Sequence, residues 1–185
     1  MSLLLAESYG SQGAWTPYTP RLLSVGLVTP GVNPADPEMG ETVATGAFSR
    51  FGRMVAGRFQ FRMGDGFGAS SERGAYGVEL PVPPFFVDNE DDQMTTPQLA
   101  GFGWAIDNTK DGLYHLFNMV YDPPWSAGNL GQSMAIMFVD DGRFSGNPPG
   151  NPLGMFGNPT PVGVPFEFTE GDVLAGQFLY QVKRD

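Results

Sequence analysis

The sequence predicts an all-β fold, a jelly-roll-like β-sandwich with an N-terminal arm and a long Pro/Gly loop. Apolar and polar residues alternate with period two from Thr42 onward, which is typical of half-buried strands. The 26 Gly and 17 Pro residues separate these runs into short segments. The 15 Phe, 6 Tyr and 3 Trp residues provide more aromatic surface than a disordered chain carries. A length of 185 residues suits one core. We therefore expect an arm over residues 1–40 and one sandwich domain over residues 41–185.

A β-hairpin is predicted between Thr45 and Met63. Gly52 and Arg53 fit the central positions of a Gly-X type II′ turn. The pairs that this turn creates are Phe51 with Met54, Phe48 with Gly57, and Gly46 with Phe59. Aromatic residues then lie opposite glycines, and this pairing of large with small residues fixes the register.

Alternation places the other strands. The predicted strands are Thr42–Phe51, Met54–Met63, Ala75–Val82, Gly101–Asp107, Leu113–Val120, Ser133–Val139 and Val173–Val182, with a further short strand at Leu22–Val28 in the arm. The segment Leu113–Val120 also fits a helical spacing, but Gly112 and Pro123 enclose it too tightly for a helix. Both faces of Val173–Val182 carry apolar residues, so we expect this strand to be central in its sheet.

Two stretches lack a strand pattern. Val87–Pro97 is an acidic loop, and Ser145–Pro165 contains Asn-Pro three times without a fixed period. A loop as long as the second is unusual within one domain. It is either a surface loop or a segment that a neighbouring subunit orders, and proline lowers the entropy lost in such ordering.

Composition excludes several classes of function. Twenty acidic and ten basic residues give a net charge of −10, which repels nucleic-acid phosphates, so we expect no direct nucleic-acid binding. The absence of cysteine excludes disulfides and Cys-based zinc sites. The first residues lack the basic segment of a secretory signal. No run approaches the roughly 18 apolar residues of a membrane span, so we expect a soluble protein without membrane insertion.

No residue pattern indicates catalysis. His115 is the sole histidine, and no nucleophile motif provides it with a partner, so a structural or surface role is expected. Asp107–Gly112 begins like a calcium loop, but Asn118 stands where bidentate coordination needs Glu. A hairpin turn is the favoured interpretation of that segment.

Two further segments have simple structural interpretations. The run Asp88, Glu90, Asp91 and Asp92 could bind a hard cation, but a run of like charges is more often a solvated loop, which is the favoured interpretation. Gly64–Gly68 lacks the lysine and the following helix of a phosphate-binding loop, which favours a link between strands. We therefore predict no catalytic residue, no cofactor and no metal ligand.

Aromatic side chains are the remaining candidates for binding. Trp and Tyr side chains stack on sugar rings, anchor interfaces or pack in cores. Core packing is expected above all for Trp104. The candidates for an interface or for glycan stacking are Trp15, Tyr18, Trp125, Met155 and Phe156. A lone sandwich would have difficulty covering six side chains of the arm and the Pro/Gly loop: Trp15, Tyr18, Leu22, Leu23, Met155 and Phe156.

A resemblance begins in the hairpin. Gly46–Arg53 contains, in order, Gly, an aromatic residue, Arg, an aromatic residue, Gly and Arg, with Ala47 and Ser49 between them. An alternating strand and a short strand ending at Leu80-Pro81 follow it. Trp15-Thr16-Pro17 precedes these elements, and Phe168–Tyr180 reads FTEGDVLAGQFLY. Together they resemble small β-rich virion proteins of tailed bacteriophages, within which the chain is similar to minor tail or fibre-tip domains. The resemblance spans most of residues 15 to 182.

The resemblance implies a non-enzymatic structural component of the virion, a minor tail protein at the tail tip that is made in the host cytoplasm. Its partners would be further copies, in a trimer or a ring, and other virion proteins. A capsid decoration protein is an alternative that would use the same features on the head surface. A carbohydrate-binding module that recognises a host cell-surface glycan is another, and it is compatible with the tail assignment.

Overall fold

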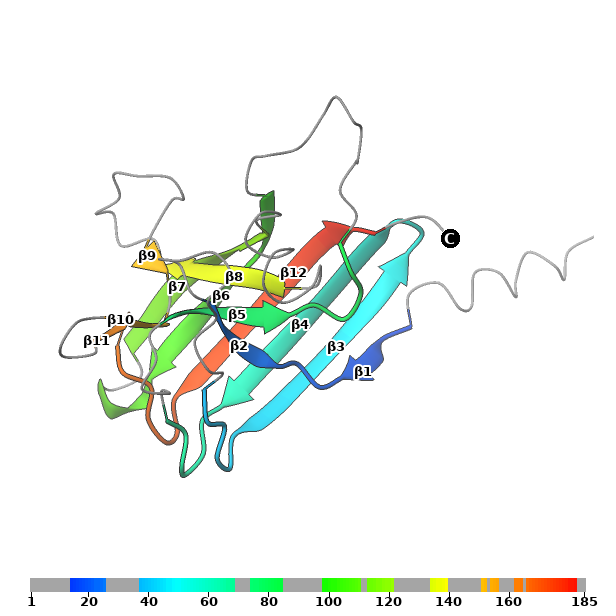
Figure 1. The fold of residues 1–185 in the computed structure, drawn as a ribbon. Coiled ribbons are helices and arrows are strands. Elements are labelled where there is room, and N and C mark those ends of the chain that lie inside the picture. Colours follow the sequence, from blue (N-terminus) through cyan, green and yellow to red (C-terminus); the bar gives the residue numbers. More distant parts are fainter. Residues whose placement is uncertain are drawn as a thin grey trace, which may run out of the picture.

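The computed structural model describes residues 14–25, 37–68, 74–84, 98–110, 113–121, 134–139, 151–152, 154–156, 162–164 and 166–182. In these ranges the regular elements are strands, apart from one short 3₁₀ helix, so the predicted all-β class is confirmed (Figure 1). No helix in the described ranges is long and apolar enough to cross a membrane.

Most of the longer strands lie within one to three residues of their predicted positions. The strands are β1 (Thr16–Tyr18), β2 (Leu22–Val25), β3 (Val43–Phe51), β4 (Met54–Arg62), β5 (Gly74–Glu79), β6 (Gln98–Asp107), β7 (Leu113–Tyr121), β8 (Met134–Val139), β9 (Asn151–Pro152), β10 (Gly154–Phe156), β11 (Val162–Val164) and β12 (Val173–Gln181). The 3₁₀ helix η1 (Asn108–Lys110) follows β6. The segment at Leu113–Val120 is a strand, as predicted.

The strands form one continuous antiparallel sheet. Its order is β1-β3-β4-β12-β6-β7-β8-β5-β10-β11, with β2 paired to β5 and β9 paired to β8. β12 lies between β4 and β6, so the prediction of a central strand is confirmed. In Figure 1 the five long strands β3, β4, β12, β6 and β7 form a broad surface on which β5 and β2 lie.

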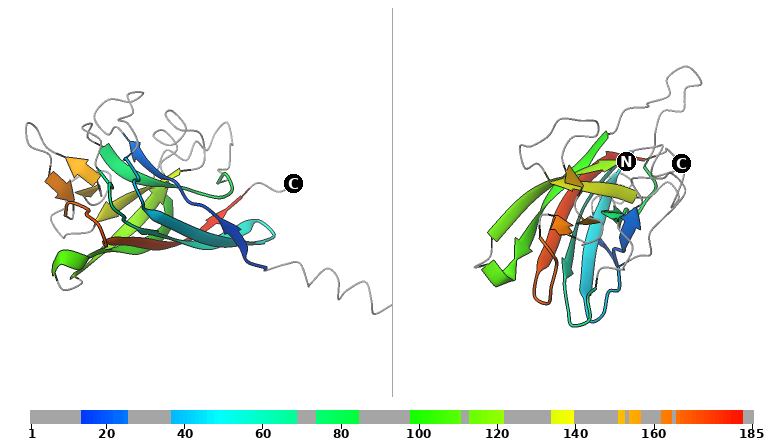
Figure 2. Two further views of the ribbon diagram at one scale, coloured as in Figure 1. Left: turned by 90° about the horizontal axis from the view of Figure 1, so that it is seen from below. Right: turned by 60° about the vertical axis from the view of Figure 1, so that its left-hand side comes forward.

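The sheet curls over itself and encloses the core. Seen from below, β5 and β2 lie on one side of the core, and β3, β4 and β12 lie on the other (Figure 2). The largest fully buried side chains come from both sides of this space: Val55, Phe61, Met63, Val78, Phe117, Met119, Met137 and Leu174. The side of the long strands that points away from this core is called the outer face below.

The β3–β4 hairpin has the predicted register. Phe51 pairs with Met54, Phe48 with Gly57, and Gly46 with Phe59. Gly52 has φ +60°, which the first central residue of a type II′ turn requires. One detail differs from the expectation: the space above Gly57 is filled by the ring of Phe178 from β12, and not by Phe48.

Aromatic rings cover four glycines on the inner face. A Cβ atom added to Gly57 would lie 2.1 Å from Phe178. An added Cβ atom would also lie within 3 Å of a ring at three more positions: at Gly46 the ring is that of Tyr18, at Gly176 that of Phe59, and at Gly103 that of Phe117. Each ring comes from a strand paired with the glycine's own strand. These close contacts explain why glycine occurs in the middle of strands, where it is otherwise unfavourable.

The described part of the expected arm belongs to the fold. β1 pairs with β3, and β2 pairs with β5. Leu22 and Leu23 are only 3% and 5% exposed, and the Tyr18 ring contacts Phe48 and Phe178. The expectation that these three side chains need a neighbouring subunit for cover is therefore wrong. The chain covers them itself, because Thr19–Arg21 carries it from one side of the core to the other.

The long Pro/Gly loop also contains strands. Within Ser145–Pro165, β9 pairs with β8, while β10 pairs with both β5 and β11. These strands have two or three residues, so they are too short to show a period of two. The acidic stretch Val87–Pro97 lies outside the described residues.

Candidate functional site

The outer face of the long strands presents the side chains that alternate with the core residues. Inward Phe59, Gly176 and Gly103 lie side by side on β4, β12 and β6. The next residues along these strands therefore point outward. Two adjacent outward rows follow from the pairing: Ala47, Arg58, Gln177 and Phe102 form one, and Thr45, Gln60, Ala175, Trp104 and Leu116 form the other.

A shallow hollow of about 440 Å³ lies between these two rows. Its side chains are Thr45, Ala47, Arg58, Gln60, Trp104, Ala175 and Gln177, and the residues Gly46, Phe59 and Gly176 complete its lining. We call this the outer-face hollow. Its volume is in the range of small-molecule sites. Small residues occupy its middle, while an indole, two amides and a guanidinium surround them.

Trp15 contacts Arg58, one of the side chains that line the outer-face hollow. The Arg58 guanidinium carbon lies 5.6 Å from the centre of the Trp15 ring, a cation–π contact. Trp15 itself is 57% exposed, so it is accessible as predicted for an interface or stacking residue. No carboxylate among the described residues pairs with Arg58.

The charge of the outer face differs from that of the chain. Among the described outward side chains of β3, β4, β12, β6 and β7, the charged ones are Arg58 and Arg62. The whole chain has a net charge of −10. These described outward side chains are therefore net basic, whereas the chain as a whole is acidic.

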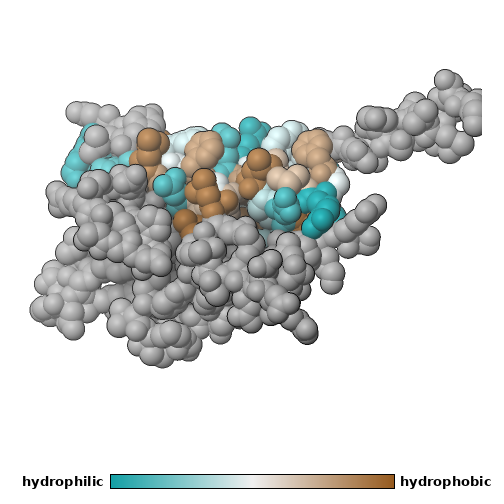
Figure 3. Space-filling view, turned by 90° about the horizontal axis from the view of Figure 1, so that it is seen from above, coloured by the Kyte–Doolittle hydropathy of each residue, from teal (hydrophilic) through white to brown (hydrophobic). Residues whose placement is uncertain are grey.

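Large apolar side chains are exposed next to the outer-face hollow. Phe102, Leu116 and Leu179 are 56%, 71% and 58% exposed on β6, β7 and β12. We call these three residues the apolar patch. In the space-filling view, hydrophobic and hydrophilic residues alternate along the band of described residues (Figure 3). Single exposed apolar residues are ordinary, whereas these three lie on neighbouring strands of one sheet.

Trp104 lies on the outer face, which corrects the expectation that it packs in the core. It is half-buried and lines the outer-face hollow, while its neighbour Ala105 is fully buried. The reason is the crowding of the inner face. The ring of Phe117 fills the space above Gly103, so the inward positions of β6 must be small and the bulky ones point outward.

Tyr18 does not fit the predicted glycan-stacking role, since its ring faces inward against Phe48 at 5.9 Å and Phe178 at 6.2 Å. Trp125 lies outside the described residues. Met155 and Phe156 belong to β10, but their side chains are outside the described part of the structure. Of the five candidates, Trp15 is the one that the structure places on an accessible described surface.

The start of the calcium-like segment forms a turn held by two buried aspartates. Asp107 accepts hydrogen bonds from the Thr109 amide and hydroxyl and an ion pair from Lys110 at 3.1 Å. These contacts, the Thr109 hydroxyl foremost, hold the pKa of Asp107 below its usual value. Asp172 accepts from the amides of Asn108 and Thr169 at 2.8 and 2.7 Å. The carboxylates thus serve the turn, as the hairpin interpretation predicts for Asp107.

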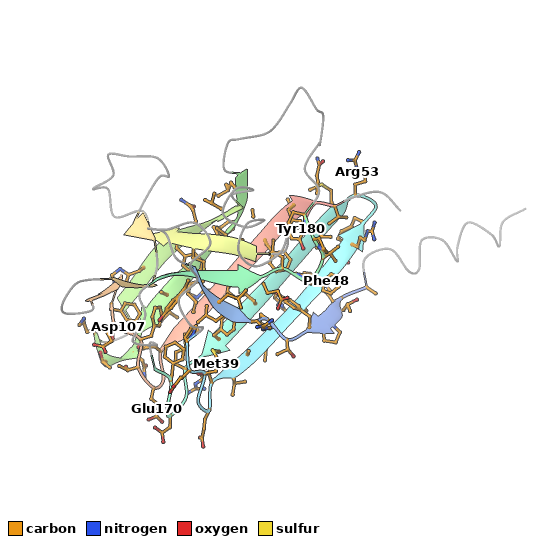
Figure 4. All side chains as sticks on the ribbon, viewed as in Figure 1. Met39, Phe48, Arg53, Asp107, Glu170 and Tyr180 are labelled. Carbon is orange, nitrogen blue, oxygen red and sulfur yellow. The ribbon has the colours of Figure 1, made fainter. Side chains whose placement is uncertain are left out.

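Other candidates lie at the end of the sheet where Figure 4 shows Asp107 and Glu170. His115 is half-buried, and its ring lies 5.5 Å from that of Phe166. Gly64–Gly68 follows β4 and is fixed by hydrogen bonds such as that from the Glu41 amide to Asp65. A hollow of about 240 Å³ beside it is lined by Asp65, Glu167 and Glu170, which would repel a phosphate.

Metal ligands do not cluster in the described ranges: no group of three or more His, Asp and Glu side chains there could hold an ion. The acidic run at Asp88, Glu90, Asp91 and Asp92 lies outside those ranges. Comparison of the chain with family models, curated proteins and solved structures finds no match.

Proposed function

We propose that this chain is a non-enzymatic structural component of a tailed-phage virion, a minor tail protein located at the tail tip. The residues that carry the resemblance support the proposal, since Gly46–Arg53 supplies most of β3 and the turn of the β3–β4 hairpin, and Phe168–Tyr180 supplies most of the central strand β12. We also propose that the curled sheet is a jelly-roll-like sandwich, which the position of β5 and β2 over the long strands supports (Figure 2).

The observation that carries an assembly role is the apolar patch. Phe102, Leu116 and Leu179 are exposed on three central strands, each of which has hydrogen-bonded neighbours on both sides. A rigid, apolar surface of this kind suits a subunit interface, where burial of aromatic and aliphatic side chains supplies most of the affinity. The proposed occupant is a second copy of the chain within a closed trimer or ring. Closed symmetry prevents the contact from propagating into fibres.

Light scattering on the purified protein tests this interface. We expect the wild type to self-associate at high micromolar concentration and Leu116→Glu to be monomeric, because a buried unpaired charge is costly. Val43→Glu is the matched control. Val43 is exposed on the same face, but it lies on β3, away from the apolar patch. A monomeric wild type, or a Leu116→Glu variant that associates like the wild type, would refute the proposed interface.

Immunogold labelling of virions with an antibody against this chain tests the location. Label at the tail end supports a minor tail protein. Label over the head surface would replace it with the capsid decoration alternative, and unlabelled particles would refute a virion role altogether.

A further inference from the structure

We propose that the outer-face hollow binds an acidic oligosaccharide, with Trp104 as the stacking platform and Arg58 as the partner of a sugar carboxylate. This inference goes beyond the structural role. It concerns the polar half of the outer face, whereas the proposed subunit interface uses the apolar patch.

Trp104 offers an aromatic surface in a fixed position. It is half-buried, and its strand β6 is hydrogen-bonded to β12 on one side and to β7 on the other. Ala175 lies directly across from it on β12 and leaves open space beside the indole. The apolar face of a pyranose ring packs on such aromatic surfaces, which hold it at a low entropic cost.

The polar side chains of the outer-face hollow suit sugar hydroxyls. Gln60 lies across Ala175 from Trp104, and Gln177 lies between Arg58 and Phe102. Each amide has two donors and one acceptor oxygen, so it can serve the donor and the acceptor of a hydroxyl at once. Thr45 adds a hydroxyl at the far side. A site with an apolar platform and a few fixed polar groups is typical of small-molecule recognition.

Arg58 selects for an acidic sugar. Its guanidinium is held over Trp15, and no described carboxylate neutralises it. A guanidinium binds a carboxylate through two parallel hydrogen bonds. The whole chain has a net charge of −10, but no described outward side chain of the long strands is acidic. At physiological salt, charges more than about 8 Å apart are largely screened. The attraction of a sugar carboxylate to the outer face therefore depends on the nearby Arg58 and Arg62.

The experiment is calorimetric or NMR titration of the full chain with uronate oligosaccharides of galacturonate, glucuronate and mannuronate. Neutral galactose, glucose and mannose oligosaccharides of the same length serve as comparison. We expect at least one uronate ligand to bind, and to bind more tightly than its neutral counterpart at low salt. Added salt should reduce this difference. If none of the uronate ligands binds at millimolar concentration, or if neutral ligands bind equally well, the proposal is overturned.

Variants locate the site. Trp104→Ala should weaken binding tenfold or more, and Arg58→Gln should weaken binding of the uronate ligand to the level of the neutral one. Phe51→Ala is the matched control, because Phe51 is an exposed aromatic outside the hollow on β3, and it should bind like the wild type. Gln177→Ala provides a second test if Trp104→Ala unfolds, since Gln177 is exposed. Unchanged binding in the folded Trp104 or Gln177 variant would refute the site. A failure of the sugar proposal is distinguishable from a failure of the assembly proposal, because light scattering measures self-association without any sugar ligand.

Discussion

At the scale of single residues, the inner face depends on contacts between rings and glycines. Gly57 and Phe178 are the tightest aromatic example, at 2.1 Å from the added Cβ atom to the ring. A side chain at Gly57 would have to displace a ring that is itself packed against Tyr18 and Tyr180. Protein cores are too dense for such a shift to cost nothing.

Gly57→Val is therefore expected to destabilise the protein by about 1 to 3 kcal/mol through overpacking. Chemical unfolding monitored by tryptophan fluorescence measures the change. Ala56→Val is the control, because Ala56 lies next to Gly57 on the outer face, and it should change stability by less than about 0.5 kcal/mol. Adding Phe178→Leu should recover part of the loss, since residues in contact couple. An unchanged midpoint for Gly57→Val would contradict the packing described for β12.

The two inward tyrosines Tyr180 and Tyr18 provide a second residue-scale prediction. The Tyr180 hydroxyl donates to the Val82 carbonyl at 2.8 Å and accepts from the Val82 amide at 3.3 Å. The buried Tyr18 hydroxyl has no hydrogen-bond partner in the described structure. Tyr180→Phe should cost about 1 to 3 kcal/mol because it leaves two backbone groups unpaired. Tyr18→Phe should be neutral or stabilising, and equal losses in the two variants would be inconsistent with these contacts.

At the scale of elements, the sequence predicts long strands well and short ones poorly. The predictions are correct for β3, β4, β7 and β12, because nine residues are enough for the alternation of apolar and polar side chains to repeat several times. β1 and β9 to β11 have two or three residues beside Gly and Pro, and they exist only because an adjacent strand pairs with them. The face of Trp104 was predicted wrongly because hydrophobicity alone suggests that the larger residue is buried. The ring that fills the space above Gly103 is that of Phe117 on β7, and local alternation cannot reveal a contact from another strand.

The element most at odds with the predicted arm is β2. Leu22 belongs to the main core, so Leu22→Ala should destabilise the protein by about 2 to 5 kcal/mol. Leu99→Ala is the control, since Leu99 is 67% exposed, and it should have an effect below about 0.5 kcal/mol. Thermal unfolding compares the two. If both variants melted like the wild type, β2 would be a dispensable arm after all.

At the scale of the whole molecule, the inner face of the sheet packs the core, and the outer face carries the proposed binding surfaces. The inner face uses rings and glycines to pack tightly, and this leaves bulky side chains of β6 on the outer face. The same constraint that moves Trp104 outward thus creates the wall of the outer-face hollow and part of the apolar patch. The proposed binding surfaces are therefore consequences of how the core is filled, and a core variant that moves β12 should disturb both.

Buried tyrosines make the stability of the whole molecule sensitive to alkaline pH. Burial, and then the nearby Glu167, raise the pKa of Tyr76 to about 12, and burial also raises the pKa values of Tyr18 and Tyr180. Below about pH 10 both the folded and the unfolded chain keep these protons, so this contribution to stability is fully present. Above that pH the unfolded chain loses protons that the folded chain retains, and stability falls until the folded pKa is reached.

Urea unfolding between about pH 8 and pH 11 should therefore show constant stability up to about pH 9.5. Beyond that we expect a decline of up to about 1.4 kcal/mol per pH unit for each retained tyrosine proton. Tyr180→Phe tests the source of the decline, because it should flatten the decline by the share of one tyrosine. A decline with the same slope in Tyr180→Phe would show that the buried phenol is not its source.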